Sequence, residues 1–103
     1  MTSAAKDSHP RLKLVEPFMH PVRFSLMAAL AGVEKLDFAS TKEHLEVSDS
    51  VLSRQASQLE ELGMVKISKG FVGKRPRTWF SLTKQGRDSW QQHLAALQSI
   101  AGT

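Results

Sequence analysis

The sequence contains no cysteine, which excludes disulfide bonds and metal sites built on thiolates. No apolar run approaches the length that spans a membrane, and no signal-peptide pattern opens the chain. Internal repeats and low-complexity tracts are also missing. These absences fit a reducing compartment, and we expect a cytoplasmic protein that contacts no membrane.

Acidic residues are missing from one continuous stretch. No Asp or Glu lies between Glu61 and Asp88, although this span holds half of all the Lys and Arg residues. The net charge of the whole chain is only +4, so the positive charge is concentrated rather than large. A clustered basic surface points to a polyanionic partner, although a solvated face is the commoner role of a charge run.

The length of 103 residues, 41% of them hydrophobic, suits one domain with a single modest core. Residues 1–9 are small and polar, and we expect them to form a disordered tail. Residues 10–101 are expected to fold as the single domain.

Residues 48–63 are predicted to form a helix with two different faces. Ser48 or Asp49 can cap its N-terminus, and Gly63 suits a left-handed C-terminal stop. One face is an apolar stripe at helical spacing, formed by Leu52, Ala56, Leu59 and Gly63. The opposite face is polar and free of acids, and comprises Ser50, Ser53, Arg54, Ser57 and Gln58. Such a face suits base edges and phosphates, but an ordinary surface helix would show the same pattern.

A second short helix is predicted just before this one. It begins at Asp37 or Ser40, ends near Glu46, and is followed by a tight turn at residues 47–49. Two short helices joined by about three residues, the second with a polar front, form a helix-turn-helix. The preceding Leu36-Asp37-Phe38 is either a very short strand or the approach to this helix.

Residues 64–83 are predicted to form a β-hairpin. Residues 64–71 and 77–83 alternate as strands with one wet face, and Gly and Pro favour a turn at 72–76. The basic residues at the tip are Lys74, Arg75 and Arg77. A basic tip beside a recognition-type helix can lie on phosphates or in the minor groove. Edge strands also carry Lys to prevent aggregation, but three charges around one proline exceed that need.

Apolar helices flank these elements. Residues 20–33 predict a central helix that is apolar most of the way round, and His20 at its start is expected to be structural. A segment starting at Pro10 and kinked at Pro17 precedes it, and a helix over 84–100 capped by Thr83 or Ser81 ends the domain.

The apolar surface of the two terminal segments can pack on the domain or on a second subunit. The candidate dimer contacts are Leu12, Val15, Phe18, Met19, Trp90, Leu94 and Leu97. Trp90 can instead close the core of the domain, and both roles can hold. His44 and His93 have no partner at i+3 or i+4, so we expect no metal site and no cofactor.

The pattern Ser50-x-x-Ser53-Arg54-x-Ala56-x-x-Leu59-x-x-x-Gly63-Met64-Val65 resembles the recognition-helix signature of bacterial ArsR and MarR-like repressors. Other segments resemble small MarR-related winged-helix regulators that consist of little more than the DNA-binding domain. These segments are His20-Pro21-Val22-Arg23, Leu36-Asp37-Phe38, residues 69–78 and Leu82-Thr83-x-x-Gly86-Arg87. The likeness covers about residues 14–98. It implies an α+β, mostly α, winged helix-turn-helix with a two-stranded wing and flanking terminal helices.

The resemblance also implies a homodimer that binds a pseudo-palindromic operator in double-stranded DNA. It assigns base contacts to Ser50, Ser53, Arg54 and Gln55, with Ser57 and Gln58 on the same helix. It assigns phosphate or minor-groove contacts to Lys74, Arg75 and Arg77, and we expect Lys69 to be a further DNA contact on the wing. Family members usually have His at position 55 and a larger apolar residue at 56, a departure that affects which sequence is preferred. The cysteines of the ArsR metal sensors have no counterpart here.

We therefore expect a sequence-specific, homodimeric transcriptional repressor. The alternative is a winged helix that binds other proteins and leaves its recognition helix unused. The chain shows no nucleophile–base pair, metal-ligand spacing or phosphate-cradling glycine loop, so we expect no enzyme. No separate ligand domain fits in this length, so any small-molecule effector would bind at the dimer interface or between the terminal helices.

Overall fold

The structure is a computed structural model that describes residues 8–102. The predicted tail, residues 1–9, therefore lies almost wholly outside the described residues. Two 3-10 helices, η1 (Pro10–Lys13) and η2 (Glu16–Met19), precede the α-helices. The α-helices are α1 (Pro21–Ala31), α2 (Phe38–Leu45), α3 (Asp49–Glu61) and α4 (Lys84–Ile100). The strands are β1 (Leu36–Asp37), β2 (Val65–Val72) and β3 (Arg75–Leu82). This order confirms the predicted winged helix-turn-helix fold.

The core lies between α1, α3 and the inner part of the sheet. Leu26, Met27 and Leu30 of α1 are fully buried, as expected for the central helix. Leu52, Ala56 and Leu59 of α3 are fully buried as well, so the predicted apolar stripe is confirmed. Burying this stripe fixes which side of α3 faces outward, and that side is polar.

Side-chain caps set where the helices begin. Of the alternatives, the structure selects Asp37 for α2, Ser48 for α3 and Thr83 for α4, each accepting a backbone N–H three residues ahead at 2.8–3.2 Å. Gly63 ends α3 with a φ of +78°, as predicted. Among the described residues other than glycine, only Glu46 has a positive φ, +55°, and it lies in the turn between α2 and α3.

The three strands form an antiparallel sheet in the order β1-β3-β2, which confirms β1 as a short strand. The hairpin is longer than predicted, because Val72 pairs with Arg75 and leaves only residues 73 and 74 in the turn. The predicted turn at 72–76 is therefore wrong. Pro76 fits inside β3 because β1 pairs only with Trp79 and Phe80, so the outer edge of β3 needs no N–H at position 76.

The segment before α1 also differs from the prediction. It is not one kinked helix but two 3-10 turns with Leu14 and Val15 in extended backbone between them. Pro17 disfavours α-helical backbone at the residue before it, which limits this segment to short turns. The segment lies along α4, where the Gln92 side chain donates to the carbonyl of Lys13 at 3.0 Å.

Phe18 and Trp90 belong to the core of the single chain. Phe18 is 1% and Trp90 is 6% exposed, and their rings meet edge to face at 5.9 Å. The prediction that these two side chains contact a second subunit is therefore wrong, whereas the alternative that Trp90 closes the core is confirmed.

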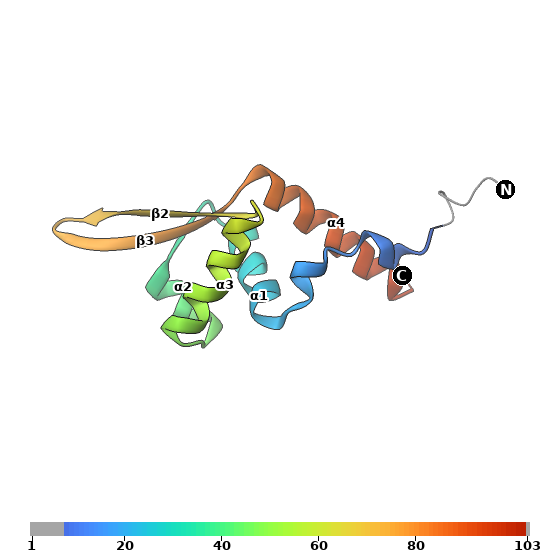
Figure 1. The fold of residues 1–103 in the computed structure, drawn as a ribbon, viewed down its shortest axis with the longest axis horizontal. Coiled ribbons are helices and arrows are strands. Elements are labelled where there is room, and N and C mark those ends of the chain that lie inside the picture. The colour runs from blue at the N-terminus through green and yellow to red at the C-terminus, as the bar shows by residue number, and fades with distance from the viewer. Residues whose placement is uncertain (1–7, 103) are drawn as a thin grey trace.

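The hairpin projects from one end of the helical body, and α4 runs toward the other end, where the N-terminal segment also lies (Figure 1).

Within residues 8–102, no helix combines the length and the apolar character needed to cross a membrane.

Candidate nucleic-acid interface

The outward side of α3 carries the polar face predicted from the sequence. Ser50, Ser53, Arg54 and Ser57 are all exposed. Arg54 makes no hydrogen bond or ion pair with any other residue of the described chain, so its guanidinium is free for a ligand. Asp49 at the start of α3 is instead paired with Lys42 of α2 at 2.7 Å, which partly neutralises the acid at that end of the polar face.

Gln55 corrects the prediction. Its side chain is only 8% exposed, and its Oε1 accepts a hydrogen bond from Nη1 of Arg23 at 2.7 Å. The physical reason is its spacing, because position 55 lies three residues after Leu52 and four before Leu59, on the buried stripe. Base contact by Gln55 is therefore wrong for this structure.

Arg23 was not identified as a functional residue from the sequence, although it lies in the His20-Pro21-Val22-Arg23 motif. Its Nη1 also donates to Oε1 of Gln58 at 2.8 Å, and its Nε donates to the carbonyl of Pro17 at 2.7 Å. Arg23 thus joins η2, α1 and α3 through one guanidinium. Gln58 is exposed, and its amide N–H groups and the second lone pair of its Oε1 remain available to a ligand.

His20 has the structural role expected of it. Its Nδ1 accepts from the backbone N–H groups of Val22 and Arg23 at 3.2 and 3.4 Å, which caps α1.

The basic wing residues occupy different faces of the hairpin. Lys69 lies on the face that continues Ile67 and Phe80 and so faces α3, whereas Arg75 and Arg77 alternate onto the opposite face with Trp79. The guanidinium of Arg77 lies 5.6 Å from the Trp79 ring centroid, a cation–π distance. Lys74 is in the turn itself.

Helix α3 and the wing border one hollow of about 270 Å³, called here the α3–wing hollow. It is lined by Phe38, Ser53, Ala56, Ser57, Glu60, Ile67, Lys69, Thr78 and Phe80. Glu60 at its base accepts from the backbone N–H of Ile67 at 3.2 Å, which ties α3 to β2. The polar front of the helix and the Lys69 face of the wing therefore look into the same space.

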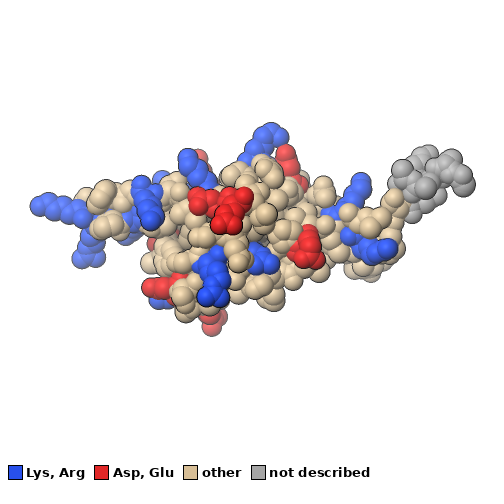
Figure 2. Space-filling view, in the orientation of Figure 1, with Lys and Arg blue, Asp and Glu red and all other residues tan. Residues whose placement is uncertain are grey.

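Charge is distributed along the molecule as the acid-free stretch suggests. In Figure 2 the end where the hairpin projects shows Lys and Arg atoms without Asp or Glu, whereas atoms of both charges lie over the helical body. The exposed cations of the wing are Lys66, Lys69, Lys74, Arg75 and Arg77.

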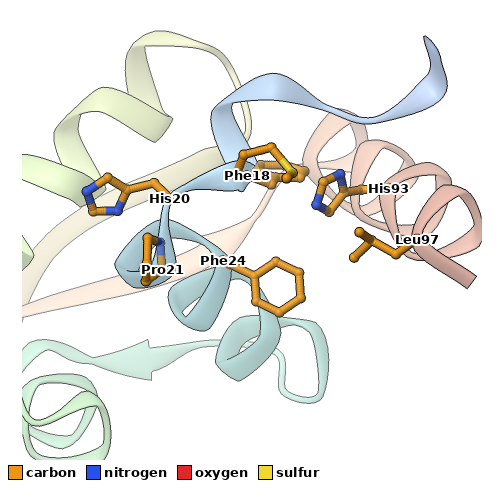
Figure 3. A pocket seen from close by; sticks show the side chains of 7 residues that line it. Phe18, His20, Pro21, Phe24, His93 and Leu97 are labelled. Carbon is orange, nitrogen blue, oxygen red and sulfur yellow. The ribbon is translucent and has the colours of Figure 1, made fainter. Parts of the chain in front are cut away.

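A separate apolar cavity lies between η2, α1 and α4 (Figure 3). Its volume is about 220 Å³, and it is lined by Phe18, Met19, His20, Pro21, Phe24, His93 and Leu97. His93 is fully buried, and its Nδ1 accepts from the backbone N–H of Val15 at 3.0 Å. Neutral His93 therefore carries its proton on Nε2, which has no hydrogen-bond partner. The described residues contain no group of three or more His, Asp or Glu that could hold a metal ion.

This burial makes stability depend on pH. Desolvation lowers the pKa of His93 below its ordinary value, so the unfolded chain takes up a proton near pH 6.5 while the folded chain does not. The His93 contribution is therefore present above pH 6.5 and is lost as the pH falls from there toward the folded pKa, by at most about 1.4 kcal/mol per pH unit. Urea unfolding of wild type and His93→Gln at pH 7, 6 and 5 measures this: the variant should show the shallower decline.

The groups facing His93 support this assignment. The side chains packed on it from η2, α1 and α4 are the uncharged Phe18, Phe24 and Trp90, and the other titratable residue lining the cavity is His20. His44 is exposed, so His44→Gln serves as the matched control for replacing a histidine with glutamine. Equal slopes for wild type and His93→Gln would contradict the assignment.

Comparison with known proteins agrees with this geometry. The sequence matches the winged helix DNA-binding domain family over residues 22–101. It is 31% identical over 84 residues to an uncharacterised protein of Methanocaldococcus jannaschii, covering 82% of this chain and 91% of that protein. The fold is similar to that of a transcriptional regulator homologue from Pyrococcus horikoshii OT3, with a TM-score of 0.78, 27% identity and coverage of 84% and 85% of the two chains. A MarR family transcriptional regulator from Silicibacter pomeroyi has a TM-score of 0.68 at 21% identity, over 84% of this chain and 56% of the other. The chain therefore belongs to the winged helix DNA-binding domain family.

Proposed function

We propose that the protein is a homodimeric, sequence-specific repressor of a pseudo-palindromic operator. The observation that supports this most directly is the α3–wing hollow, because the free face of α3 and the basic wing border the same space. Two α3 helices would enter successive major grooves about 34 Å apart, with each wing on the flanking phosphates or minor groove.

Within each half-site, the exposed residues divide by chemistry. Arg54 can donate two hydrogen bonds to guanine, and Ser50, Ser53 and Ser57 allow a close approach of the helix to base edges and phosphates. Gln58 can donate through its amide. Lys69, Lys74, Arg75 and Arg77 are assigned to the DNA backbone, where they neutralise phosphates without reading sequence.

The dimer contact is proposed at the end of the molecule remote from the wing. Leu12 and Met19 of the N-terminal segment are exposed, as is Ile100 at the end of α4. Val15, Leu94 and Leu97 are half-buried beside them. Large apolar side chains gathered on two adjacent terminal segments suit a self-complementary interface around a two-fold axis.

The cavity of Figure 3 is the proposed site of any effector, because its walls are apolar and one of its lining residues is His93, whose buried Nε2–H has no hydrogen-bond partner. A small aromatic carboxylate matches that chemistry, because one of its oxygens can accept from Nε2 of His93. The melting temperature measured with and without such a compound tests this site. The compound should raise the melting temperature of the wild-type protein but not that of His93→Gln, and equal shifts in both proteins would reject the site.

Binding of labelled genomic fragments at increasing salt tests the proposed function, with light scattering to measure the mass of the free and bound protein. We expect a dimer whose affinity falls steeply, with a slope of about −0.9 for each phosphate neutralised. A protein-interaction module would instead show no salt-sensitive DNA binding, and a monomeric complex would contradict the palindromic operator.

A further inference from the structure

The wing carries an aromatic side chain that packs against no core. Phe71 is 72% exposed, more than any other large hydrophobic side chain of residues 8–102. It lies two residues before the turn and is paired across the hairpin with Pro76. Because the subunit leaves most of this phenyl ring exposed, folding of the domain does not account for its presence.

Strand alternation places Phe71 on the face of the wing that looks toward α3. Going outward, this face carries Val65, Ile67, Lys69 and Phe71 of β2, and the first of them is buried in the core. Lys69 and Ile67 line the α3–wing hollow together with Ser53 and Ser57 of α3. Phe71 therefore continues the wall of that hollow beyond the edge of the helical body.

The surroundings of Phe71 favour a polyanion over an apolar protein surface. Lys69 precedes it on the same face, and Lys74, Arg75 and Arg77 follow at the turn and on the opposite face, with no acid anywhere on the hairpin. A purely apolar partner would have to desolvate these cations without pairing them. The DNA minor groove instead offers phosphates at its rims and apolar deoxyribose rings along its walls.

We propose that Phe71 is an apolar DNA contact, whose ring packs on sugars or a base step in the minor groove beside the half-site. Arg75, Arg77 and Lys74 hold the phosphates on either side. This inference rests on the proposed DNA-binding function. It adds a residue that favours easily unstacked base-pair steps, because an apolar side chain inserted between base pairs partly unstacks them.

The contact has a signature that separates it from the basic residues. A phenyl ring displaces no counterions, so removing it lowers affinity without changing the dependence on salt. Removing a phosphate-binding Lys or Arg changes both.

The experiment compares Phe71→Ala with Val72→Ala, a matched control at the same tip. Val72 is 47% exposed, but it lies on the other face of the hairpin from Phe71, where it is paired with Arg75. The probe is a fluorescein-labelled 30-base-pair duplex enriched from a random pool with wild-type protein. We expect Phe71→Ala to weaken binding about tenfold with an unchanged salt slope, and Val72→Ala to weaken it less than about twofold. Both variants should keep the wild-type melting temperature, because neither side chain is in the core.

Hydroxyl-radical footprinting of the same complexes locates the contact. Phe71→Ala should lose protection at the minor-groove segment outside the α3 footprint and keep protection within it. If the wild-type protein binds the duplex but the two variants bind it with equal affinities, the inference about Phe71 is overturned and the proposed function stands. A reduced salt slope for Phe71→Ala would have the same meaning. Failure of the wild-type protein to bind any duplex would overturn the proposed function together with it.

Discussion

Replacing Gly86 with alanine is expected to destabilise the domain by about 3 kcal/mol, lowering the melting temperature by more than about 10 °C. An added Cβ at this position would overlap the carbonyl oxygen of Met64 and come within 2.8 Å of its carbonyl carbon. Both atoms belong to backbone between α3 and β2, which the Thr83 N–H also engages at 3.1 Å. The clash therefore cannot be relieved by rotating a side chain, and α4 has to move away from the sheet.

Gly32→Ala is the matched control for this substitution. Gly32 ends α1 with a φ of −94°, and an added Cβ there meets no atom within 4 Å. Its stability should stay within about 0.5 kcal/mol of wild type. Urea and thermal unfolding of both variants make the comparison, and a Gly86→Ala protein as stable as Gly32→Ala would show that α4 does not press on Met64.

Replacing Arg54 with alanine is expected to weaken binding to the preferred sequence by about 1–3 kcal/mol, which is about 5-fold to 160-fold. The physical reason is that Arg54 is exposed at the centre of the polar face and is engaged by no other described residue. Its guanidinium can therefore pair with a guanine edge without breaking an internal bond. Fluorescence anisotropy on the enriched duplex and on random duplex measures the loss and the change in base preference.

Arg75→Ala provides the contrast on the wing. A phosphate contact contains no sequence information, so this variant should lose the same factor on both duplexes and reduce the salt slope by about 1. Equal losses on the two duplexes for Arg54→Ala would mean that Arg54 binds the backbone, and the base-reading role would have to be reassigned.

Local features were predictable from the sequence because their causes are local. The capping side chains of Asp37, Ser48 and Thr83 and the left-handed Gly63 act within four residues of the backbone groups they satisfy. The apolar stripe of α3 follows from helical spacing alone. Together with the alternating strands, these features were enough to predict the order of elements and the polar front.

The errors arose where neighbours distant in sequence decide the outcome. The family resemblance assigned a base contact to Gln55, but Arg23, thirty-two residues away, supplies a donor that lets Gln55 stay buried. Phe18 and Trp90 lie on apolar faces, and periodicity does not show that each covers the other within one chain. The turn was misplaced because the position of Pro76 depends on where β1 ends beside β3.

The three bonds of Arg23 have a mechanical consequence. The carbonyl of Pro17 is in the segment proposed to meet the second subunit, and the two glutamine oxygens are on the helix proposed to read DNA. Rotation of one subunit of the proposed dimer against the other would strain these bonds. The angle between the two α3 helices would therefore depend on how the N-terminal segments pack at the dimer contact. In the proposed dimer, Arg23 would therefore connect the segment that meets the second subunit with the helix that enters the major groove.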